Sequence, residues 1–265
     1  MLVEKDMLNL AFTIQDLEYF LLILTRVSTF IFVAPVFGTN AVPGRVKIVL
    51  SFFISFLLYY AIEPIYPVYS TVLGYAIIVT KEAVTGILIG WGSQMCTNIA
   101  SLAGRLIDME SGLSMVSEFD PATNQQVTIT GLFYNYIFLL MLIVSGMYEY
   151  IIRALADTFI LIPINGMVFQ SDKLLNVVLI FIKDFFVIGF RISLPIFAVI
   201  MLMNTIFGVL AKIAPQLNMF AVGIQIKILT ALSIMFLTVG LMPSAASFIF
   251  EEIKKITTLF VEAML

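Results

Sequence analysis

The sequence predicts an all-α, polytopic membrane protein built from long, kinked helical hairpins. Two observations indicate this class. Of the 265 residues, 61% are hydrophobic and only 12% are charged, whereas soluble domains carry about 25% charged residues. Long apolar segments alternate with short polar turns, and none of the polar blocks reaches the roughly 50 residues that a soluble domain needs. We therefore expect residues 1–265 to form a single integral membrane unit in contact with membrane lipid.

The residue types present exclude several kinds of site. Histidine is absent and cysteine occurs once, as Cys96, so histidine-based catalysis and most zinc sites lack their side chains. The sequence also contains no nucleotide-binding loop. The net charge of −3 includes no long run of one sign, which argues against nucleic acid as a partner. We expect no enzymatic activity, no cofactor and no catalytic or metal site.

The first half of the chain alternates apolar segments with breakers. Residues 19–37 are predicted to form a first membrane helix that ends at the APVFG motif, residues 34–38. The next apolar run, residues 48–62, has 15 residues, fewer than the ~20 that a span needs. Residues 72–103 lack proline and predict a helix of about 48 Å, longer than the ~30 Å hydrocarbon core. Within them, the small-residue pair Gly86 and Gly90 permits close helix packing.

The second half predicts a membrane span followed by a hairpin of unusually long helices. Residues 127–146 form the span, and residues 174–213 predict a helix that is kinked at Pro195. Residues 220–250 return as a second long helix, with a break near Gly240 and Pro243.

The APQLN sequence, residues 214–218, is predicted to be the polar turn between these two long helices. With the N-terminus outside, this turn faces the cytoplasm, although the positive residues discriminate weakly between the two orientations. The residues assigned to this cytoplasmic turn are Pro215, Gln216 and Asn218.

Seven charged residues lie inside apolar stretches, where each costs roughly 2.5–3.5 kcal/mol at the centre of a membrane helix. They cannot all face lipid. Two adjacent pairs among them cannot pair within their own helix, because neighbouring side chains point apart. We expect partners on other segments or on other chains. The seven residues are Arg26, Lys81, Glu82, Lys183, Asp184, Arg191 and Lys227.

Residues 105–126, RLIDMESGLSMVSEFDPATNQQ, form the longest polar interruption in the chain. Breakers at Gly104, Gly112 and Pro121 allow the backbone to leave helical geometry. Apolar residues interleave with acids, a mixture that is too apolar for a free linker and too charged for a span. The segment is either a loop that packs on protein or lines a wet cavity, or an ordinary, partly amphipathic surface loop.

Three passages resemble the FliR family of flagellar biosynthetic proteins, whose virulence counterpart is the SctT family of type III secretion. The first is RVSTFIFVAPVFGTNAVPGRVKIVLS, residues 26–51. The second is the glycine-spaced stretch of residues 104–121, which ends in FDP. The third is APQLNMFAVGIQIK, residues 214–227. The combination of FDP and APQLN makes the resemblance specific.

The resemblance implies a structural subunit of the flagellar export gate, a channel through which unfolded proteins leave the cell. Its implied location is the bacterial inner membrane, at the flagellar basal body. The implied partners are FliP-type and FliQ-type membrane proteins and an FlhB-type export switch protein. Residues 1–172 would correspond to FliP-like helices and residues 173–265 to a FliQ-like hairpin.

The resemblance also implies that residues 105–126 act as a plug in the closed channel. A static brace between the two halves of the chain is the alternative role for this segment. A secondary transporter of a small solute is the alternative function, although the matching internal repeats typical of transporters are not apparent in the sequence. The residues assigned to plugging and gating are Met109, Glu110, Leu113, Met115, Phe119, Asp120 and Pro121.

Overall fold

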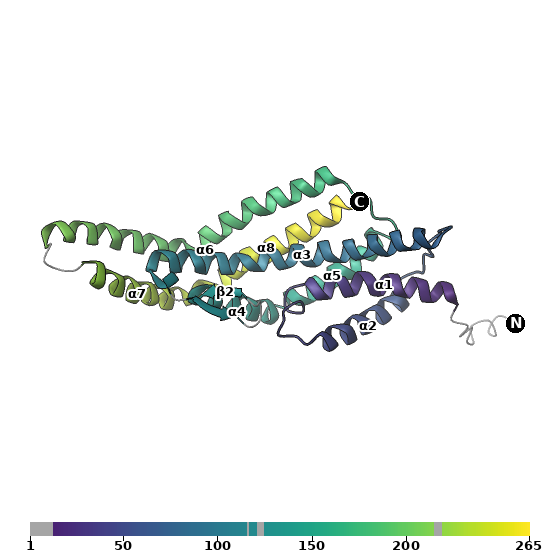
Figure 1. Cartoon of the computed structure of the whole chain (residues 1–265), viewed down its shortest axis with the longest axis horizontal. Helices are drawn as coiled ribbons and strands as arrows, with labels where there is room; N and C mark the ends of the chain where they lie inside the picture. Colours follow the sequence, from purple (N-terminus) through teal and green to yellow (C-terminus); the bar gives the residue numbers. More distant parts are fainter. Residues whose placement is uncertain (1–12, 116, 121–124, 215–218) are drawn as a thin grey trace.

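The computed structural model describes residues 13–115, 117–120, 125–214 and 219–265. Within these ranges the chain forms eight α-helices, two short 3-10 helices and one two-stranded hairpin. The predicted all-α fold class is therefore confirmed. The molecule is elongated, and most of its helices run roughly along the long axis (Figure 1).

Helix α1 (Ile14–Val33) has a defined signal at each end. At its start, Thr13 and Asp16 form a capping box, in which each side chain accepts a hydrogen bond from the backbone amide of the other residue. At its end, Ala34 adopts an extended conformation with ψ 148°, because the residue that precedes a proline is driven out of the helical region. The predicted end of this helix at the APVFG motif is thus confirmed.

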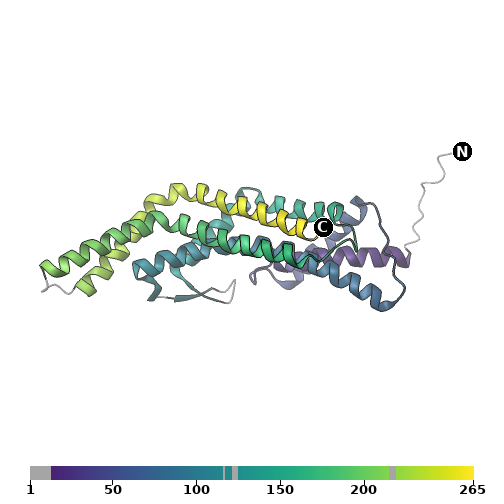
Figure 2. The same cartoon turned by 90° about the horizontal axis from the view of Figure 1, so that it is seen from above.

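Helices α2 (Gly44–Ala61) and α3 (Val72–Ser111) differ greatly in length and surroundings. Helix α2 packs against α1, whereas α3 contacts α1 and five helices from later in the chain. Helix α3 has 40 residues, which corresponds to about 60 Å at 1.5 Å per residue. It is the central rod of the molecule, and Figure 2 shows the same elongated arrangement from above.

The structure corrects the prediction that residues 105–126 form one loop. Residues 105–111 continue helix α3, which ends at Gly112 in the left-handed conformation, with φ 87°. The chain then forms the 3-10 helix η1 (Leu113–Met115) and two antiparallel strands. The strands, β1 (Ser117–Asp120) and β2 (Gln125–Thr128), pair in the register Ser117 opposite Thr128 and Asp120 opposite Gln125.

Helices α4 (Ile129–Val144) and α5 (Met147–Leu161) follow the hairpin and are bent by 68° relative to each other. The bend lies at Gly146, whose φ of 72° suits a residue without a Cβ atom. Of the residues predicted as a span, 127–146, the first two belong to β2 and residues 129–144 form α4. Helix α4 is long and apolar enough to cross a membrane only when it is counted together with α5.

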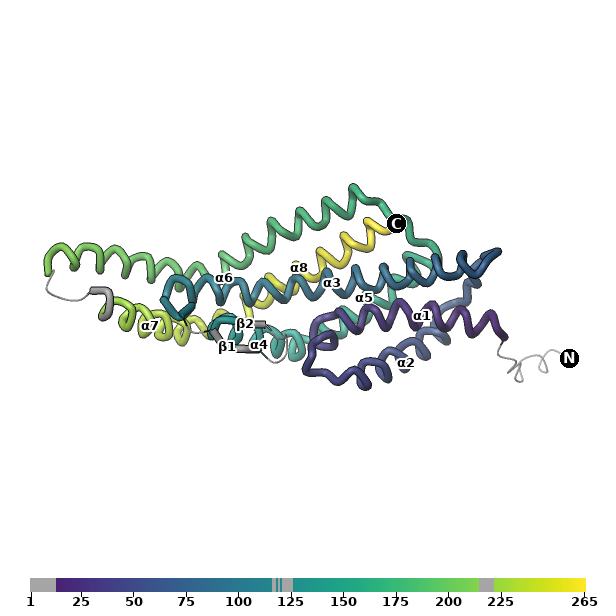
Figure 3. The backbone as a smooth tube through the Cα atoms, in the orientation of Figure 1, coloured from purple at the N-terminus to yellow at the C-terminus, as the bar shows by residue number. Residues whose placement is uncertain are grey.

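The C-terminal part forms the predicted hairpin of long helices. Helix α6 (Ser171–Ile213) has 43 residues with Pro195 inside it, and it changes direction along its length (Figure 3). Its second half and α7 (Met219–Thr238) extend together beyond the other helices (Figure 1). The predicted break is confirmed as the 3-10 helix η2 (Val239–Leu241), after which α8 (Met242–Ala263) returns toward the bundle.

Four helical segments in the described part are long and apolar enough to cross a membrane, and the bent pair α4–α5 is a fifth if it counts as one broken span. The protein is thus a multi-pass membrane protein. Helix α1 is not among them; it carries Asp16, Glu18 and Arg26, so its crossing of the membrane stays a prediction. The four segments are Gly44–Ala61, Val72–Ser111, Ser171–Ile213 and Val222–Ala263.

Candidate functional site

Arg26 is a fully buried cation that connects three helices. From α1, its Nε donates to Oε2 of Glu82 on α3 at 2.6 Å, and both side chains are 0% exposed. Its Nη1 donates to the backbone oxygens of Thr158 and Ile162, at the end of α5, at 3.1 and 3.0 Å. The guanidinium carbon lies 4.2 Å from the centroid of the Phe159 ring. We call this group of contacts the arginine node.

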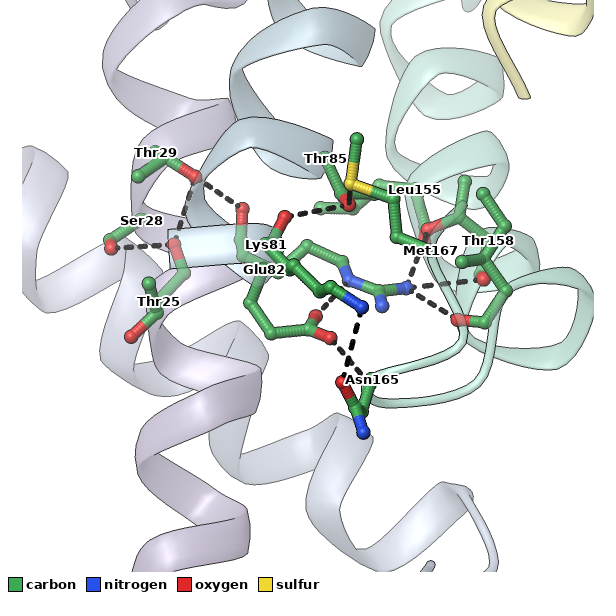
Figure 4. Close-up of polar contacts among 12 residues, drawn as sticks. Thr25, Ser28, Thr29, Lys81, Glu82, Thr85, Leu155, Thr158, Asn165 and Met167 are labelled. Atoms are coloured by element: carbon green, nitrogen blue, oxygen red, sulfur yellow. Dashed lines mark hydrogen bonds and ion pairs between the residues drawn. The ribbon is translucent and has the colours of Figure 1, made fainter. Parts of the chain in front are cut away.

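The second oxygen of Glu82 extends the node to the turn after α5. Oε1 accepts a hydrogen bond from the backbone amide of Asn165 at 3.0 Å. Asn165 has a positive φ of 66°, a conformation that asparagine adopts more readily than most residues. The neighbouring Lys81 donates to Oδ1 of the same asparagine at 3.5 Å (Figure 4). Two adjacent residues of α3 therefore hold one turn.

Close packing of α1 on α3 makes this geometry possible. A Cβ atom on Gly86 would lie 2.2 Å from both the Arg26 carbonyl oxygen and Thr29 Oγ1. A Cβ atom on Gly90 would lie 2.9 Å from the Phe30 carbonyl oxygen. The predicted small-residue pair thus serves close helix approach, as such pairs do in membrane proteins.

The other predicted intramembrane charges are placed differently. Asp184 of α6 forms an ion pair with Lys255 of α8, whose Nζ lies 3.7 Å from Glu252 Oε2. The guanidinium of Arg191 lies 3.9 Å from the centroid of the Phe248 ring. Lys183 is exposed and Lys227 is half-buried, and neither forms an ion pair with the residues that the structure describes. Sequence reasoning missed Lys255 and Glu252, because they lie near the chain end among ordinary terminal charges.

Buried Asp108 holds the base of the central hairpin. Its Oδ2 accepts from the backbone amide of Thr130 at 2.8 Å, so the end of α3 satisfies a free amide at the start of α4. The two helices also approach closely, because a Cβ atom on Gly104 would lie 2.4 Å from the backbone of Gly131. The segment formed by η1, β1 and β2 is therefore firmly held at both of its ends.

A side-chain contact joins the hairpin to α4. Asp120, at the end of β1, is 1% exposed, and its Oδ1 accepts from the Tyr136 hydroxyl at 3.0 Å. We call this contact the hairpin latch. Unlike the arginine node, it joins a strand of only four residues to a helix, and such small elements open at low free-energy cost.

The predicted gating residues are divided among α3, the 3-10 helix η1 and the hairpin. Met109 and Glu110 belong to α3, which corrects their assignment to a loop. Met109 and Met115 are 66% and 79% exposed, whereas Leu113 is half-buried. Phe119 lies in β1, with its side chain outside the description, and Pro121 lies outside the described residues. The predicted cytoplasmic turn residues Pro215, Gln216 and Asn218 lie outside them as well.

A cavity of about 600 Å³ opens between α3, α4 and α6, beside the hairpin. We call it the polar groove, because amide and hydroxyl side chains line much of it. Sequence reasoning missed this site, although the spacing of Gln94, Asn98, Ser101 and Arg105 at i, i+4, i+7 and i+11 places all four on one helix face. Tyr136 and Asp120, the two latch residues, also line the groove.

A comparison with protein families now identifies the kind of protein. The sequence profile of the bacterial export proteins, family 1, matches residues 17–253, which include every helix of the arginine node and the hairpin. The chain belongs to this family. The resemblance inferred from the three sequence passages is therefore confirmed.

Individual relatives match this export protein along most of its length. It is 28% identical over 247 residues to the flagellar biosynthetic protein FliR of Bacillus subtilis (strain 168), covering 92% of each chain. It is 29% identical to the FliR protein of Pectobacterium carotovorum, covering 86% of this chain and 87% of that one. It is 27% identical to the FliR protein of Escherichia coli (strain K12), covering 87% of each chain.

Proposed function

We propose that the chain is a structural subunit of the flagellar export gate, which forms a protein-conducting channel together with FliP-type and FliQ-type membrane proteins. The observation that carries this proposal is the family match over residues 17–253, joined by relatives named as flagellar biosynthetic proteins. In this role the protein contributes walls and a gate, while an FlhB-type switch protein and the energy source act from outside it.

Helix length and surface character support a place inside a larger assembly. Helices α3 and α6, of 40 and 43 residues, exceed the ~20 residues that cross a hydrocarbon core. Large apolar side chains are exposed along the arm of α6 and α7, among them Leu202, Leu229 and Phe236. Exposed apolar surface of this extent marks contact with lipid or with other proteins. Residues 1–172 would act as the FliP-like part and residues 173–265 as the FliQ-like part.

The central hairpin is the proposed plug. It is short, and it contacts α4 through the hairpin latch. It follows the 3-10 helix η1, which holds the exposed Met115 and the half-buried Leu113. Flexible methionine side chains fill irregular gaps well, which suits a seal that forms and reopens. The firm attachment at Asp108 allows the hairpin to move while the helices on either side stay in place.

Copurification from a flagellated host tests this function. We expect an affinity-tagged copy, extracted in mild detergent, to carry FliP-type and FliQ-type proteins in one particle of defined mass. We also expect deletion of the chain to abolish secretion of flagellar proteins, and a plasmid copy to restore it. A solitary protein that moves a small solute, in cells whose flagellar secretion continues without it, would overturn the proposal.

A further inference from the structure

The polar groove contains polar side chains that make no side-chain hydrogen bond to the described part of the chain. Gln94, Asn98 and Arg105 of α3 and Asn135 of α4 line it, and none of the four donates or accepts a side-chain hydrogen bond within the described ranges. Asn98 and Arg105 are exposed, while Gln94 and Asn135 are half-buried. In a chain that is 61% hydrophobic, four such groups facing one cavity indicate a ligand that hydrogen-bonds.

The dimensions of the groove suit an extended peptide. Gln94 and Arg105 are separated by three turns of α3, a distance of about 16 Å at 1.5 Å per residue. An extended chain rises about 3.3 Å per residue, so about five residues would lie along this polar face. Helix α6 contributes Phe185 and Phe186 to the lining, and α4 adds Leu139 one turn after Asn135. The groove thus offers hydrogen bonds from α3 and α4 together with apolar contact from α4 and α6.

The chemistry of the lining selects among possible occupants. Amide side chains both donate and accept, which is what a peptide backbone requires, and they do so whatever its sequence. An acyl chain would leave all four polar groups without partners. A partner helix satisfies its own backbone groups internally, so it would hydrogen-bond to these amides only where it carried suitable polar side chains. An extended polypeptide whose backbone is unpaired satisfies them best.

We propose that the polar groove binds a short extended segment of the polypeptide in transit, through hydrogen bonds from α3 and α4 to its backbone. This inference rests on the proposed function and specifies where on this chain the exported polypeptide is held. Because Asp120 and Tyr136 line the same groove, a segment that enters it lies against the hairpin latch. Occupancy of the groove and opening of the hairpin would then be linked.

Site-specific photocrosslinking tests the proposal in the assembled gate. A photoreactive amino acid replaces Asn98 or Asn135, and the export substrate carries a tightly folded C-terminal domain that arrests it in the channel. The matched control is Phe133, also on α4, which is 46% exposed and does not line the groove. We expect both groove positions to crosslink to the arrested substrate several-fold more than Phe133 does.

The outcomes separate this inference from the proposed function. Substrate crosslinks from Met115 but from neither Asn98 nor Asn135 would overturn the groove assignment and leave the channel role intact. Crosslinks from the two groove positions to a partner subunit alone would also overturn it. If arrested substrate crosslinks to none of these positions, and cells export without this chain, both the groove assignment and the proposed function are overturned.

Substitution of the lining provides a second measurement. Asn98→Leu keeps the size of the side chain and removes its hydrogen bonds, whereas Asn98→Gln keeps the amide. We expect Asn98→Leu combined with Asn135→Leu to lower the secretion rate several-fold in fully assembled gates, and the glutamine variants to restore most of it. Unchanged secretion by assembled double-leucine gates would contradict the proposal.

Discussion

Arg26 of α1 and Glu82 of α3 lie 56 residues apart in the sequence and meet at 2.6 Å in a fully buried ion pair. Backbone groups extend the pair, because Arg26 donates to two carbonyl oxygens at the end of α5 and Glu82 accepts from the amide of Asn165. A buried ion pair adds little net stability by itself, but the loss of one member is costly. The node therefore fixes how three helices fit together.

Removal of Glu82 should disrupt this arrangement. Glu82→Ala leaves a buried guanidinium without its carboxylate, at a typical cost of about 3–5 kcal/mol. We expect the variant to assemble poorly with partner proteins and to unfold at lower temperature in detergent. The matched control is Glu149→Ala, because Glu149 pairs with Arg153 at 3.8 Å on the surface, where such pairs contribute about 0.3–0.5 kcal/mol. Parent-like assembly of Glu82→Ala would show that the node is dispensable.

The close contact at Gly86 should be as sensitive as the ion pair. In Gly86→Ala, the new methyl group would lie 2.2 Å from two oxygen atoms of α1, and overpacking of this kind costs about 1–3 kcal/mol. We expect reduced thermal stability of the purified assembly. Gly208→Ala is the control, since a Cβ atom there meets nothing within 4 Å and alanine favours the helix by about 0.5–1 kcal/mol. Equal stability of the two variants would argue against close packing of α1 on α3.

The start of α1 should respond to extremes of pH. Asp16 accepts hydrogen bonds from Thr13 and from the Tyr66 hydroxyl at 2.6 Å, and these bonds lower its pKa from 3.8 to about 2. The same bond raises the pKa of Tyr66 from 10.0 to about 12. The stabilisation by Asp16 is present above pH 3.8 and is lost as the pH falls through 2; that by Tyr66 is present below pH 10.0 and is lost as the pH rises through 12.

A titration of Tyr66 measures this contact directly. We expect Asp16→Asn to move the pKa of Tyr66 back toward 10. The ultraviolet absorbance of the Tyr66 phenolate, compared between the parent and the variants, follows this titration. Tyr69→Phe is the control, because its hydroxyl does not contact Asp16. An unchanged Tyr66 titration in Asp16→Asn would show that the two side chains do not meet in solution.

The hairpin latch should control leakage through the closed gate. Tyr136→Phe removes the hydroxyl that donates to Asp120 at 3.0 Å, and hydrogen bonds to charged groups contribute about 1.5–3 kcal/mol. We expect this variant to assemble normally and to leak ions, measured as growth inhibition and as conductance in planar bilayers. Tyr148→Phe serves as the control, since its hydroxyl donates to the exposed Glu149 at 3.3 Å. A Tyr136→Phe gate that does not leak ions would indicate that the latch does not hold the hairpin closed.

Several elements could be read from local sequence because local chemistry decides them. Pro35 ends α1, and the Gly240 region breaks the last hairpin helix, as predicted. The extension of α3 through residues 105–111 was missed although its signals are local: the residues are mostly good helix formers, and Gly112 supplies the left-handed stop. The acids in this stretch predict a loop, yet Asp108 is buried because Thr130 supplies its partner.

Other features depend on contacts between distant parts of the chain. The four-residue strands β1 and β2 contain SEFD and QQVT, which have weak strand propensity, and Asp120 of β1 contacts the distant Tyr136 of α4. The need of Arg26 for a partner followed from its cost in an apolar segment. The identity of that partner followed only from the fold, which also brought Asp184 to Lys255. The polar groove likewise required the placement of α4 and α6 beside α3.

Deletion of the hairpin decides between a plug and a brace. Because residues up to Ser111 belong to α3, the deletion should begin after Gly112 and end before Thr128, with a short glycine linker. This design keeps Asp108 and its bond to Thr130, and therefore the junction of α3 with α4. If the hairpin is a plug, its deletion should leave the gate assembled and make the membrane permeable to ions and small solutes. If the hairpin is a brace, its deletion should abolish assembly without any leak. A deletion that assembles and does not leak would falsify the plug assignment, because the arginine node and the Asp108 contact would then hold a closed channel without the hairpin.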